Sequence, residues 1–224
     1  MILKNQLLDN DFRKIPFIRM IVMGRTVPTI MRREGFLMYK RVIGPQDQSQ
    51  FDSIWQEAWL EKGFELEPSN EESHRLLILD DETAVGTVEF KRYIPGYASI
   101  DQVAPFQASI LLRESPDAVM EVDKVAILKA HRGKHIGKML TAMTLFAEQE
   151  GIRYFVSLLD PVFYRALKVS FRIPIDCVSE DRPYYKGARV VPAILHVHDV
   201  YGNKERYPWL VPSHEFGQTE KVAI

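Results

Sequence analysis

The 224-residue chain is predicted to fold as a mixed α/β domain of the α+β class, in which a β-hairpin and further strands combine with helices. Two strand-like runs, residues 75–79 and 84–93, flank an Asp-Asp-Glu turn and predict a β-hairpin. Between strand-like runs at residues 118–128 and 154–159, residues 136–150 carry apolar side chains at helical spacing. Apolar residues make up 46% of the chain and charged residues 26%, which is typical of a globular protein.

The elements before the hairpin follow from local sequence. Residues 1–34 mix apolar and basic side chains without a clear period, so no more than short helices are expected there. Residues 36–43 are expected to form a strand that ends at the Gly44-Pro45 turn signal. Residues 47–62 have apolar side chains near helical spacing, and Gly63 follows where a helix commonly ends.

The second half of the chain adds further elements. Residues 94–117 contain three prolines and are expected to form a connection with one short helix. Gly151 is expected to close the helix of residues 136–150. The remaining expected elements are a helix at residues 162–169, strand-like runs at residues 171–178 and 190–200, and an irregular tail from residue 201.

The expected organisation is a basic N-terminal extension of residues 1–35, a main domain of residues 36–200 and a tail of residues 201–224 that packs on the domain. No run approaches the roughly 18 apolar residues of a membrane span, so none is expected. The single cysteine, Cys177, cannot form an internal disulfide and favours a cytoplasmic location. Cys177 is expected to be a small buried side chain.

The net charge of −1 conceals a basic segment. Residues 13–41 contain eight Lys or Arg residues and one acidic residue. Such a segment is more often a solvated face, but it can also attract a phosphate-bearing cosubstrate, an acidic carrier protein or a lipid surface. No helix that could read nucleic acid accompanies it, so a nucleic-acid partner is not expected.

One unit indicates chemistry: the strand EVDKVAI at residues 121–127, followed by the loop and helix start HRGKHIGK at residues 131–138. Amides at a helix start near Gly133 and Gly137, with basic side chains around them, predict a cradle for a diphosphate. The loop is not a P-loop, because three residues rather than four separate its glycines, and no GxGxxG motif is present. The candidate diphosphate-binding residues are Arg132, Gly133, Lys134, His135, Ile136, Gly137 and Lys138.

This unit resembles the phosphate loop, (Q/R)xxGx(G/A), of the GNAT superfamily of acyltransferases. Arg132 and Gly137 match its first and last positions, and His135 stands where a glycine is usual. Residues 84–90 (AVGTVEF) look like the family's turn between its second and third strands, and the resemblance covers roughly residues 36–200. It implies the GNAT fold, which has a central, mixed but mostly antiparallel sheet with helices on both faces. The sheet is splayed between strands 4 and 5, and pantetheine lies in the gap.

Within the superfamily, the chain resembles the acyl-homoserine-lactone synthases and the related N-acyl amino acid synthases. EVDKVAI is similar to their E(I/L)SR(F/L)AV strand, and residues 184–197 are similar to a strand near the end of that group. Glu89 stands where the lactone synthases have an arginine, which argues against lactone synthesis. The implied donor is acyl-CoA, acetyl-CoA or the phosphopantetheine of an acyl carrier protein, and no metal is implied.

Acyl transfer to an amine requires removal of a proton, because an alkylammonium group with a pKa of about 10.4 has no free lone pair. Glu121 and Asp123 share one face of the strand, and Glu121 is the preferred base. Alternatively, Glu121 forms only a surface ion pair with Lys124 and Lys129. The candidate oxyanion donors, if the strand bulges away from its neighbour, are the backbone amides of Val125, Ala126 and Ile127.

Tyr164 is the candidate general acid for the departing thiolate, because FYRALKVSF resembles the family's FYxxxGF motif. A packing role for Tyr164 is the alternative. His196 and His198 are expected on one face of the last strand, where two ligands are too few for a metal site. Aromatic side chains expected in the core are Trp55, Trp59 and Phe64.

The sequence therefore predicts a cytoplasmic N-acyltransferase that moves an acyl group from a pantetheine thioester to the amine of a small molecule such as an amino acid. Two alternatives stay open: an acetyl-CoA-dependent N-acetyltransferase, and a non-catalytic regulatory module that binds acyl-CoA. An acyl carrier protein is a candidate partner, and the choice between monomer and homodimer is left open.

Overall fold

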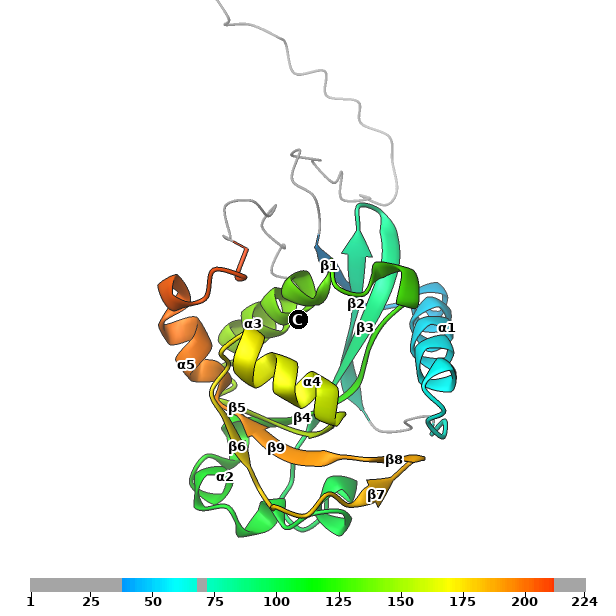
Figure 1. Ribbon diagram of the computed structural model, residues 1–224. Helices are drawn as coiled ribbons and strands as arrows, with labels where there is room; N and C mark the ends of the chain where they lie inside the picture. Colours follow the sequence, from blue (N-terminus) through cyan, green and yellow to red (C-terminus); the bar gives the residue numbers. More distant parts are fainter. Residues whose placement is uncertain (1–37, 68–71, 212–224) are drawn as a thin grey trace, which may run out of the picture. The chain divides into compact units, whose positions relative to one another are not determined.

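The computed structural model describes residues 38–67 and 72–211, and within them seven strands form one sheet in the order β1-β2-β3-β4-β5-β9-β6 (Figure 1). The strands of this sheet are β1 (Tyr39–Arg41), β2 (Ser73–Asp80), β3 (Thr83–Arg92), β4 (Val119–Ile127), β5 (Tyr154–Leu159), β6 (Ile175–Cys177) and β9 (Val191–Leu195). A separate hairpin consists of β7 (Tyr184–Tyr185) and β8 (Ala188–Arg189). The pair β4–β5 is parallel and the other neighbours are antiparallel, which confirms the predicted mixed, mostly antiparallel sheet.

The α-helices are α1 (Pro45–Glu61), α2 (Ile110–Glu114), α3 (Ile136–Glu150), α4 (Pro161–Arg165) and α5 (Val197–Gly202). A π-helical turn, η5 (Ala166–Ser170), continues α4. Short 3-10 segments are η1 (Ser99–Gln102), η2 (Phe106–Ala108), η3 (Pro116–Ala118), η4 (Lys129–His131) and η6 (Lys204–Arg206). The helix of residues 136–150 has its predicted bounds, and Gly151 closes it with a φ of +70°, a value that favours glycine.

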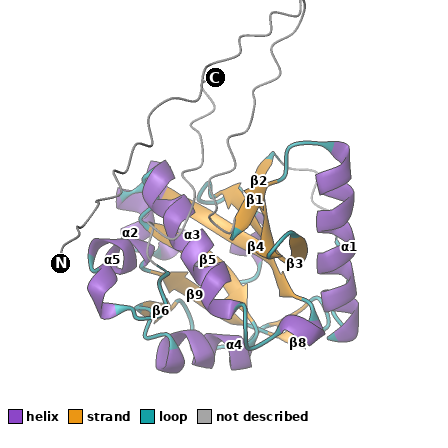
Figure 2. Cartoon of the chain, turned by 90° about the horizontal axis from the view of Figure 1, so that it is seen from above, coloured by secondary structure: helices purple, strands orange, loops and turns teal. Residues whose placement is uncertain are grey.

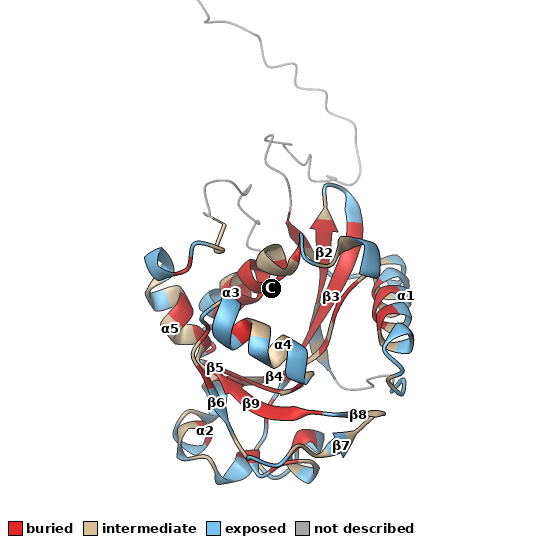
Figure 3. Cartoon of the chain, in the orientation of Figure 1, coloured by how far each residue is buried: buried red, intermediate tan, exposed pale blue. Residues whose placement is uncertain are grey.

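Helices cover both faces of the sheet, as predicted (Figure 2). Successive side chains of a strand point to opposite faces, and β2 shows this clearly. Leu76 and Ile78 pack in the cluster that contains α3, whereas Leu77 and Leu79 pack in the cluster that contains α1. The central strands are therefore buried almost throughout their length (Figure 3).

The sheet opens between β4 and β5. Pairing is limited to Val119–Glu121 of β4 and Tyr154 to Val156 of β5, although both strands continue beyond it. Ser157 Oγ donates a hydrogen bond to Val122 O, 2.9 Å away, at the point where backbone pairing stops. The predicted splay between these strands is confirmed, because β4 and β5 both continue without backbone pairing beyond this point.

A β-bulge in β4 accompanies this opening. Thr87 pairs with Ala126 and Glu89 with Asp123, so β4 has one residue more than β3 over this stretch. Lys124 has a φ of +45°, and its carbonyl accepts a hydrogen bond of 2.8 Å from Thr87 Oγ1. Its amide donates to Asp123 Oδ1, also at 2.8 Å. These side-chain bonds satisfy the backbone groups that the bulge removes from the ladder.

The C-terminal strand predictions are partly wrong. Of residues 171–178, only the three of β6 form a strand, and residues 197–202 form α5 rather than a continuation of β9. Val197 and Val200, three residues apart, both enter the core, which is helical spacing. His198 therefore lies on a helix and not on a strand face. Cys177 is exposed rather than buried, because β6 is the last strand of the sheet and pairs only with β9.

The predicted basic extension of residues 1–35 lies outside the described residues, as does the tail beyond residue 211. Residues 201–211 run along α3, where the Val211 amide donates to Thr141 Oγ1 at 3.3 Å and Trp209 Nε1 donates to Phe171 O at 2.8 Å. Among the described residues, no helix combines the length and apolarity that crossing a bilayer demands.

Candidate functional site

A cavity of about 600 Å³ fills the opening between β4 and β5. The second half of β4 forms one wall, and the start of α4 forms another. The C-terminal end of α1 and the β7–β8 hairpin close it from the side. Residues that line it include Trp59, Phe64, Lys91, Glu121, Asp123, Lys124, Val125, Ala126, Ile127, Arg132, Ile136, Leu158, Phe163, Tyr185 and Lys186.

Three charged side chains meet at one end of the cavity. Lys91 of β3 lies opposite Glu121 of β4, with 3.8 Å between Nζ and Oε1, and its Nζ donates to Asp123 Oδ2 at 2.9 Å. Burial alone would lower the pKa of Lys91, but attraction to Asp123 and Glu121 outweighs it and raises the pKa. Burial alone would raise the pKa of the Asp123 carboxyl, but attraction to Lys91 and Lys124 outweighs it and holds this pKa below the usual value. Lysine and aspartate are therefore both charged at neutral pH.

Glu121 is 8% exposed and lines the cavity, so the structure places the preferred base at the site. The alternative expected an ion pair of Glu121 with Lys124 and Lys129, and the structure pairs Glu121 with Lys91 instead. Lys124 forms a buried ion pair with Glu89, and Lys129 lies 3.6 Å from Glu61 at the surface. The partner of Glu121 in the ladder is Lys91, because the bulge turns Lys124 away from the alternation of the strand.

The buried pair of Glu89 and Lys124 lies behind the bulge. Glu89 is fully buried and also accepts hydrogen bonds from Arg75 Nε at 2.8 Å and Ser73 Oγ at 2.9 Å. Lys124 Nζ lies 5.3 Å from the centre of the Trp55 ring. Trp55 is buried, as predicted, and takes part in supporting the bulge rather than in lining the cavity.

The backbone of β4 turns some amides toward the cavity. The Leu128 amide donates to Val85 O at 2.9 Å, so alternation along the ladder directs the Ala126 amide toward β3 as well. Ile127 then faces the open side, and its carbonyl accepts a hydrogen bond of 3.1 Å from Arg132 Nε. Val125 lies beside the bulge and lines the cavity. Of the three predicted oxyanion donors, Ile127 is thus oriented toward the opening, whereas Ala126 is held in the ladder.

The basic loop leads into α3 at the other end of the cavity. Gly133 has a φ of +84°, which favours glycine, and is exposed. His135 precedes α3 without capping it through its side chain, so the first amides of the helix have no acceptor from this residue. Ile136, the first helical residue, lines the cavity. The helix start and the gap between the strands therefore form one continuous site.

The loop's charged residues have partners within the protein. Arg132 makes two hydrogen bonds to Glu61 of α1, at 3.0 and 2.7 Å. Lys138 Nζ lies 3.5 Å from Asp80 at the end of β2, and Lys134 is exposed. Gly137 faces Trp209, whose carbonyl oxygen would lie 3.6 Å from an added Cβ. The basic side chains are thus partly neutralised, and Lys134 remains directed to solvent.

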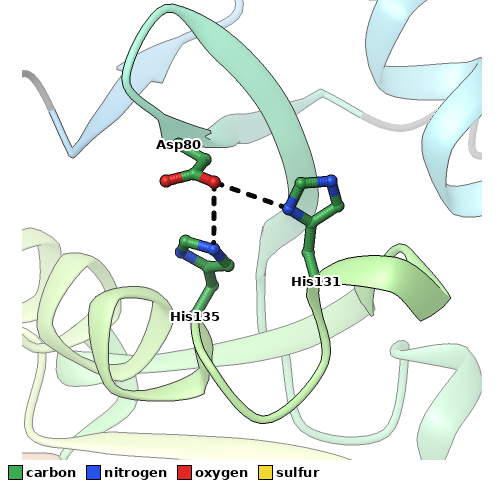
Figure 4. Close-up of side chains that lie close together, drawn as sticks. All are labelled: Asp80, His131 and His135. Atoms are coloured by element: carbon green, nitrogen blue, oxygen red, sulfur yellow. Dashed lines mark ion pairs between the residues drawn. The ribbon is translucent and has the colours of Figure 1, made fainter.

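Asp80 also lies near both histidines of the loop (Figure 4). Its Oδ2 is 3.3 Å from His135 Nε2 and 3.6 Å from His131 Nδ1. Burial lowers the pKa of His135 despite the nearby carboxylate. His135 is therefore a neutral, buried side chain behind the loop rather than a charged group available to a diphosphate.

The structure does not bring Tyr164 to the cavity. Val162, Phe163 and Ala166 line it, and at 100° per residue Tyr164 falls on the opposite side of α4. Its hydroxyl lies 3.5 Å from Lys168 Nζ, at the surface. The motif match is also inexact, because Phe171 follows Tyr164 by seven positions, two more than in the family's motif. The general-acid role of Tyr164 stays a prediction, which its place outside the cavity lining does not support.

Sequence reasoning missed the β7–β8 hairpin as a wall of the site. Its two-residue turn, Lys186-Gly187, has φ values of +46° and +89°, as a tight hairpin turn requires. The Lys186 carbonyl accepts a hydrogen bond from the Glu65 amide at 3.1 Å, which joins the hairpin to the segment after α1. The Lys-Gly pair within residues 184–189 was a usable turn signal. Trp59 and Phe64, expected in the core, line the cavity instead.

Two comparisons with known proteins bear on this site. A model of the acetyltransferase (GNAT) family matches residues 46–165. No curated protein sequence matches the chain.

Solved structures share the fold at low sequence identity. FeeM, an N-acyl amino acid synthase from uncultured soil microbes, has a TM-score of 0.59 at 12% identity, covering 72% of this chain and 91% of its own. BjaI, a CoA-dependent acyl-homoserine lactone synthase with SAM and isopentyl-CoA, has a TM-score of 0.52 at 11% identity, covering 78% and 92%. The AHL synthase LasI has a TM-score of 0.51 at 12% identity, covering 71% and 88%.

Proposed function

The chain belongs to the acetyltransferase (GNAT) family, and from that premise we propose that it is an N-acyltransferase that moves an acyl group from a pantetheine thioester to the amine of a small molecule such as an amino acid. The observation that carries the proposal is the cavity between β4 and β5. It has the first turn of α3 at one end and a carboxylate, Glu121, at the other.

The donor's diphosphate is assigned to the start of α3. Helix N-termini bind phosphate because their first amides lack intrahelical acceptors and carry the positive end of the helix dipole. Gly133 leaves open space above its backbone, and Lys134 adds an exposed positive charge. An extended pantetheine chain would then follow β4 along its unpaired edge, where the strand has no neighbour to complete its ladder.

The reaction we propose is a direct attack of the amine on the thioester carbonyl. Glu121 accepts a proton from the ammonium group, directly or through a water molecule, and the freed lone pair forms the new C–N bond. The carbonyl π electrons move to oxygen, where the Ile127 amide is oriented to donate a hydrogen bond. Collapse of this intermediate breaks the C–S bond, the positively charged nitrogen loses its second proton to give the neutral amide, and the departing thiolate takes up one proton to leave as a thiol.

Glu121 suits the role of base better than Asp123. Both Asp123 oxygens accept hydrogen bonds, from Lys91 Nζ at 2.9 Å and from the Lys124 amide at 2.8 Å. The pKa of Asp123 is also lowered, which makes it a weaker proton acceptor.

The test uses the full chain with three thioester donors, acetyl-CoA, a long-chain acyl-CoA and a long-chain acyl carrier protein, and a set of amino acids and simple amines. Mass spectrometry detects the amide product. Glu121→Gln is expected to reduce kcat by roughly 10²- to 10⁴-fold while donor affinity stays within twofold. The matched control is Glu114→Gln, because Glu114 is exposed and outside the cavity lining.

Each outcome separates the readings. Product from acetyl-CoA alone identifies an N-acetyltransferase, whereas product from the long-chain donors alone supports an N-acyl synthase. Tight binding of a donor without product in any combination would contradict an enzyme and favour a regulatory module. Unchanged kcat in the Glu121→Gln protein would remove Glu121 from the mechanism.

A further inference from the structure

We propose that Asp80, His131 and His135 form a binding site for a divalent transition-metal cation of the zinc type. The three residues come from the end of β2 and from both sides of the basic loop before α3 (Figure 4). Imidazole nitrogens and a carboxylate oxygen are the ligands that zinc takes in three-residue protein sites with an open fourth position. This inference stands apart from the acyltransferase proposal.

The separations fit a shared cation. In a tetrahedral site with metal–ligand bonds of about 2.0–2.1 Å, neighbouring ligand atoms lie about 3.3–3.4 Å apart. Asp80 Oδ2 lies 3.3 Å from His135 Nε2 and 3.6 Å from His131 Nδ1. One ligand atom from each of the three residues can be chosen so that all lie within 4.8 Å of one another. The two separations that involve Asp80 thus match a tetrahedral site to within a few tenths of an ångström, and rotation of the partly exposed His131 ring can adjust the remaining one.

The environment of His135 supports the site independently of these separations. Its side chain is 6% exposed, and neither ring nitrogen has a hydrogen-bond partner among the described residues. The 3.3 Å contact with Asp80 thus has the length of a polar contact but not the alignment of a hydrogen bond. A buried nitrogen without a partner is costly in a folded protein, and ligation of a metal through Nε2 removes that cost for the nitrogen that faces Asp80.

One oxygen of the Asp80 carboxylate faces the two imidazoles, and the other faces a lysine. Lys138 Nζ lies 3.5 Å from Asp80 Oδ1, whereas both imidazoles face Oδ2. Lys138 can therefore act on the outer oxygen, as the partners of metal-ligating carboxylates do. The site would join the β2–β3 turn to the loop that starts α3.

The second group of metal-ligating side chains, His196, His198 and Asp199, provides a control. Here the side chains already have partners within the protein: His196 Nε2 lies 2.7 Å from Asp176 Oδ2, and His198 Nδ1 lies 3.2 Å from Arg153 O. Changing His198 to Gln removes a histidine from the chain without touching the proposed site.

The experiment is equilibrium dialysis of the metal-free full chain, without a histidine tag, against ZnCl₂, followed by metal analysis. We expect one zinc ion per chain that depends on this site, and a loss of affinity of at least about 100-fold in Asp80→Asn and His135→Gln, because removal of a ligand should exceed the effect of an outer-shell change. His198→Gln should bind this ion as the unmodified protein does. Circular dichroism verifies folding, and Asp80→Asn, at a partly exposed turn, keeps the test valid if His135→Gln does not fold.

Less than one zinc ion per unmodified chain would overturn the proposal. The proposal would also be overturned if the Asp80→Asn and His135→Gln proteins kept the bound zinc and the His198→Gln protein lost it. Two bound ions, of which only one disappears in Asp80→Asn, would support it. Co²⁺ gives a second readout, because its visible absorption should show tetrahedral coordination in the unmodified protein and lose it in Asp80→Asn.

Discussion

Lys124 offers a direct test of how the bulge in β4 is held. Its ammonium group is 3% exposed and pairs with Glu89, which is 0% exposed. Substitution to Met keeps the length and the backbone conformation but leaves the Glu89 carboxylate without this partner. We expect the free energy of unfolding to fall markedly, because removal of one member of a buried pair leaves an uncompensated charge.

The magnitude follows from the partners that remain. Removing one member of a buried ion pair costs about 3–5 kcal/mol. Glu89 keeps Arg75 Nε at 2.8 Å and Ser73 Oγ at 2.9 Å, so the lower end, about 3 kcal/mol, is expected. In the double variant with Glu89→Gln, the buried charge is gone as well. The double variant should therefore lose less unfolding free energy than the Lys124→Met and Glu89→Gln variants lose in sum, by at least about 0.5–1 kcal/mol.

The assay is urea denaturation at pH 7 of the parent, the two single variants and the double variant. Their midpoints can be compared if the m values are equal. Lys129→Met is the matched control, because Lys129 is 79% exposed and pairs with Glu61 at the surface. It should not move the midpoint measurably. The reasoning would be refuted by a Lys124→Met protein as stable as the parent, or by single losses that add without coupling.

Three further substitutions test other parts of the site. Gly86→Ala would place a Cβ 2.7 Å from Ala126 O, so we expect a loss of about 1–3 kcal/mol in urea denaturation, against no comparable loss for Gly202→Ala, where nothing lies within 4 Å. Gly187→Ala adds a contact of 2.7 Å with Gly63 O at a φ of +89°, and should likewise lower stability by about 1–3 kcal/mol, with equal stability counting against the hairpin turn described. The lowered pKa of Asp123 means that its ionised form stabilises the fold above the unfolded value of about 3.9, and that this contribution is lost as pH falls through the folded value. Asp123→Asn should therefore be less stable than the parent at pH 6, and the difference should shrink toward pH 3. A difference that grows on acidification would contradict the sign.

Local sequence was sufficient for the elements with strong periodicity. The helix of residues 136–150 has an apolar stripe and a terminal glycine, and both its bounds are as predicted. The strand of residues 154–159 is likewise as predicted. The secondary structure of residues 190–200 was ambiguous. Its apolar run followed by alternating histidines fits one long strand, but it also fits a short strand that leads into a helix. The competing helical spacing of Val197 and Val200 decided the outcome.

The role of a side chain was predictable only where residues close to it in the sequence determine which way it points. Glu121 reached the cavity because the alternation of β4 holds up to the bulge. Its partner Lys91 was not predictable, because the register between β3 and β4 depends on pairing across 30 residues. The place of Tyr164 was not predictable either, because the face of α4 that meets the cavity depends on how the helix packs against distant strands.

The sequence by itself determined the β2–β3 hairpin, the order of elements from β4 to β5, the basic glycine loop at the start of α3 and the family to which they point, since these depend on residues close together in the chain. Tertiary structure alone decided the position of the bulge at Lys124, the pairing of Lys91 with Glu121, and the meeting of Asp80 with the histidines of the loop. Those features arise from strand register and from contacts between distant segments, and a single residue of register shift would direct the same side chains elsewhere.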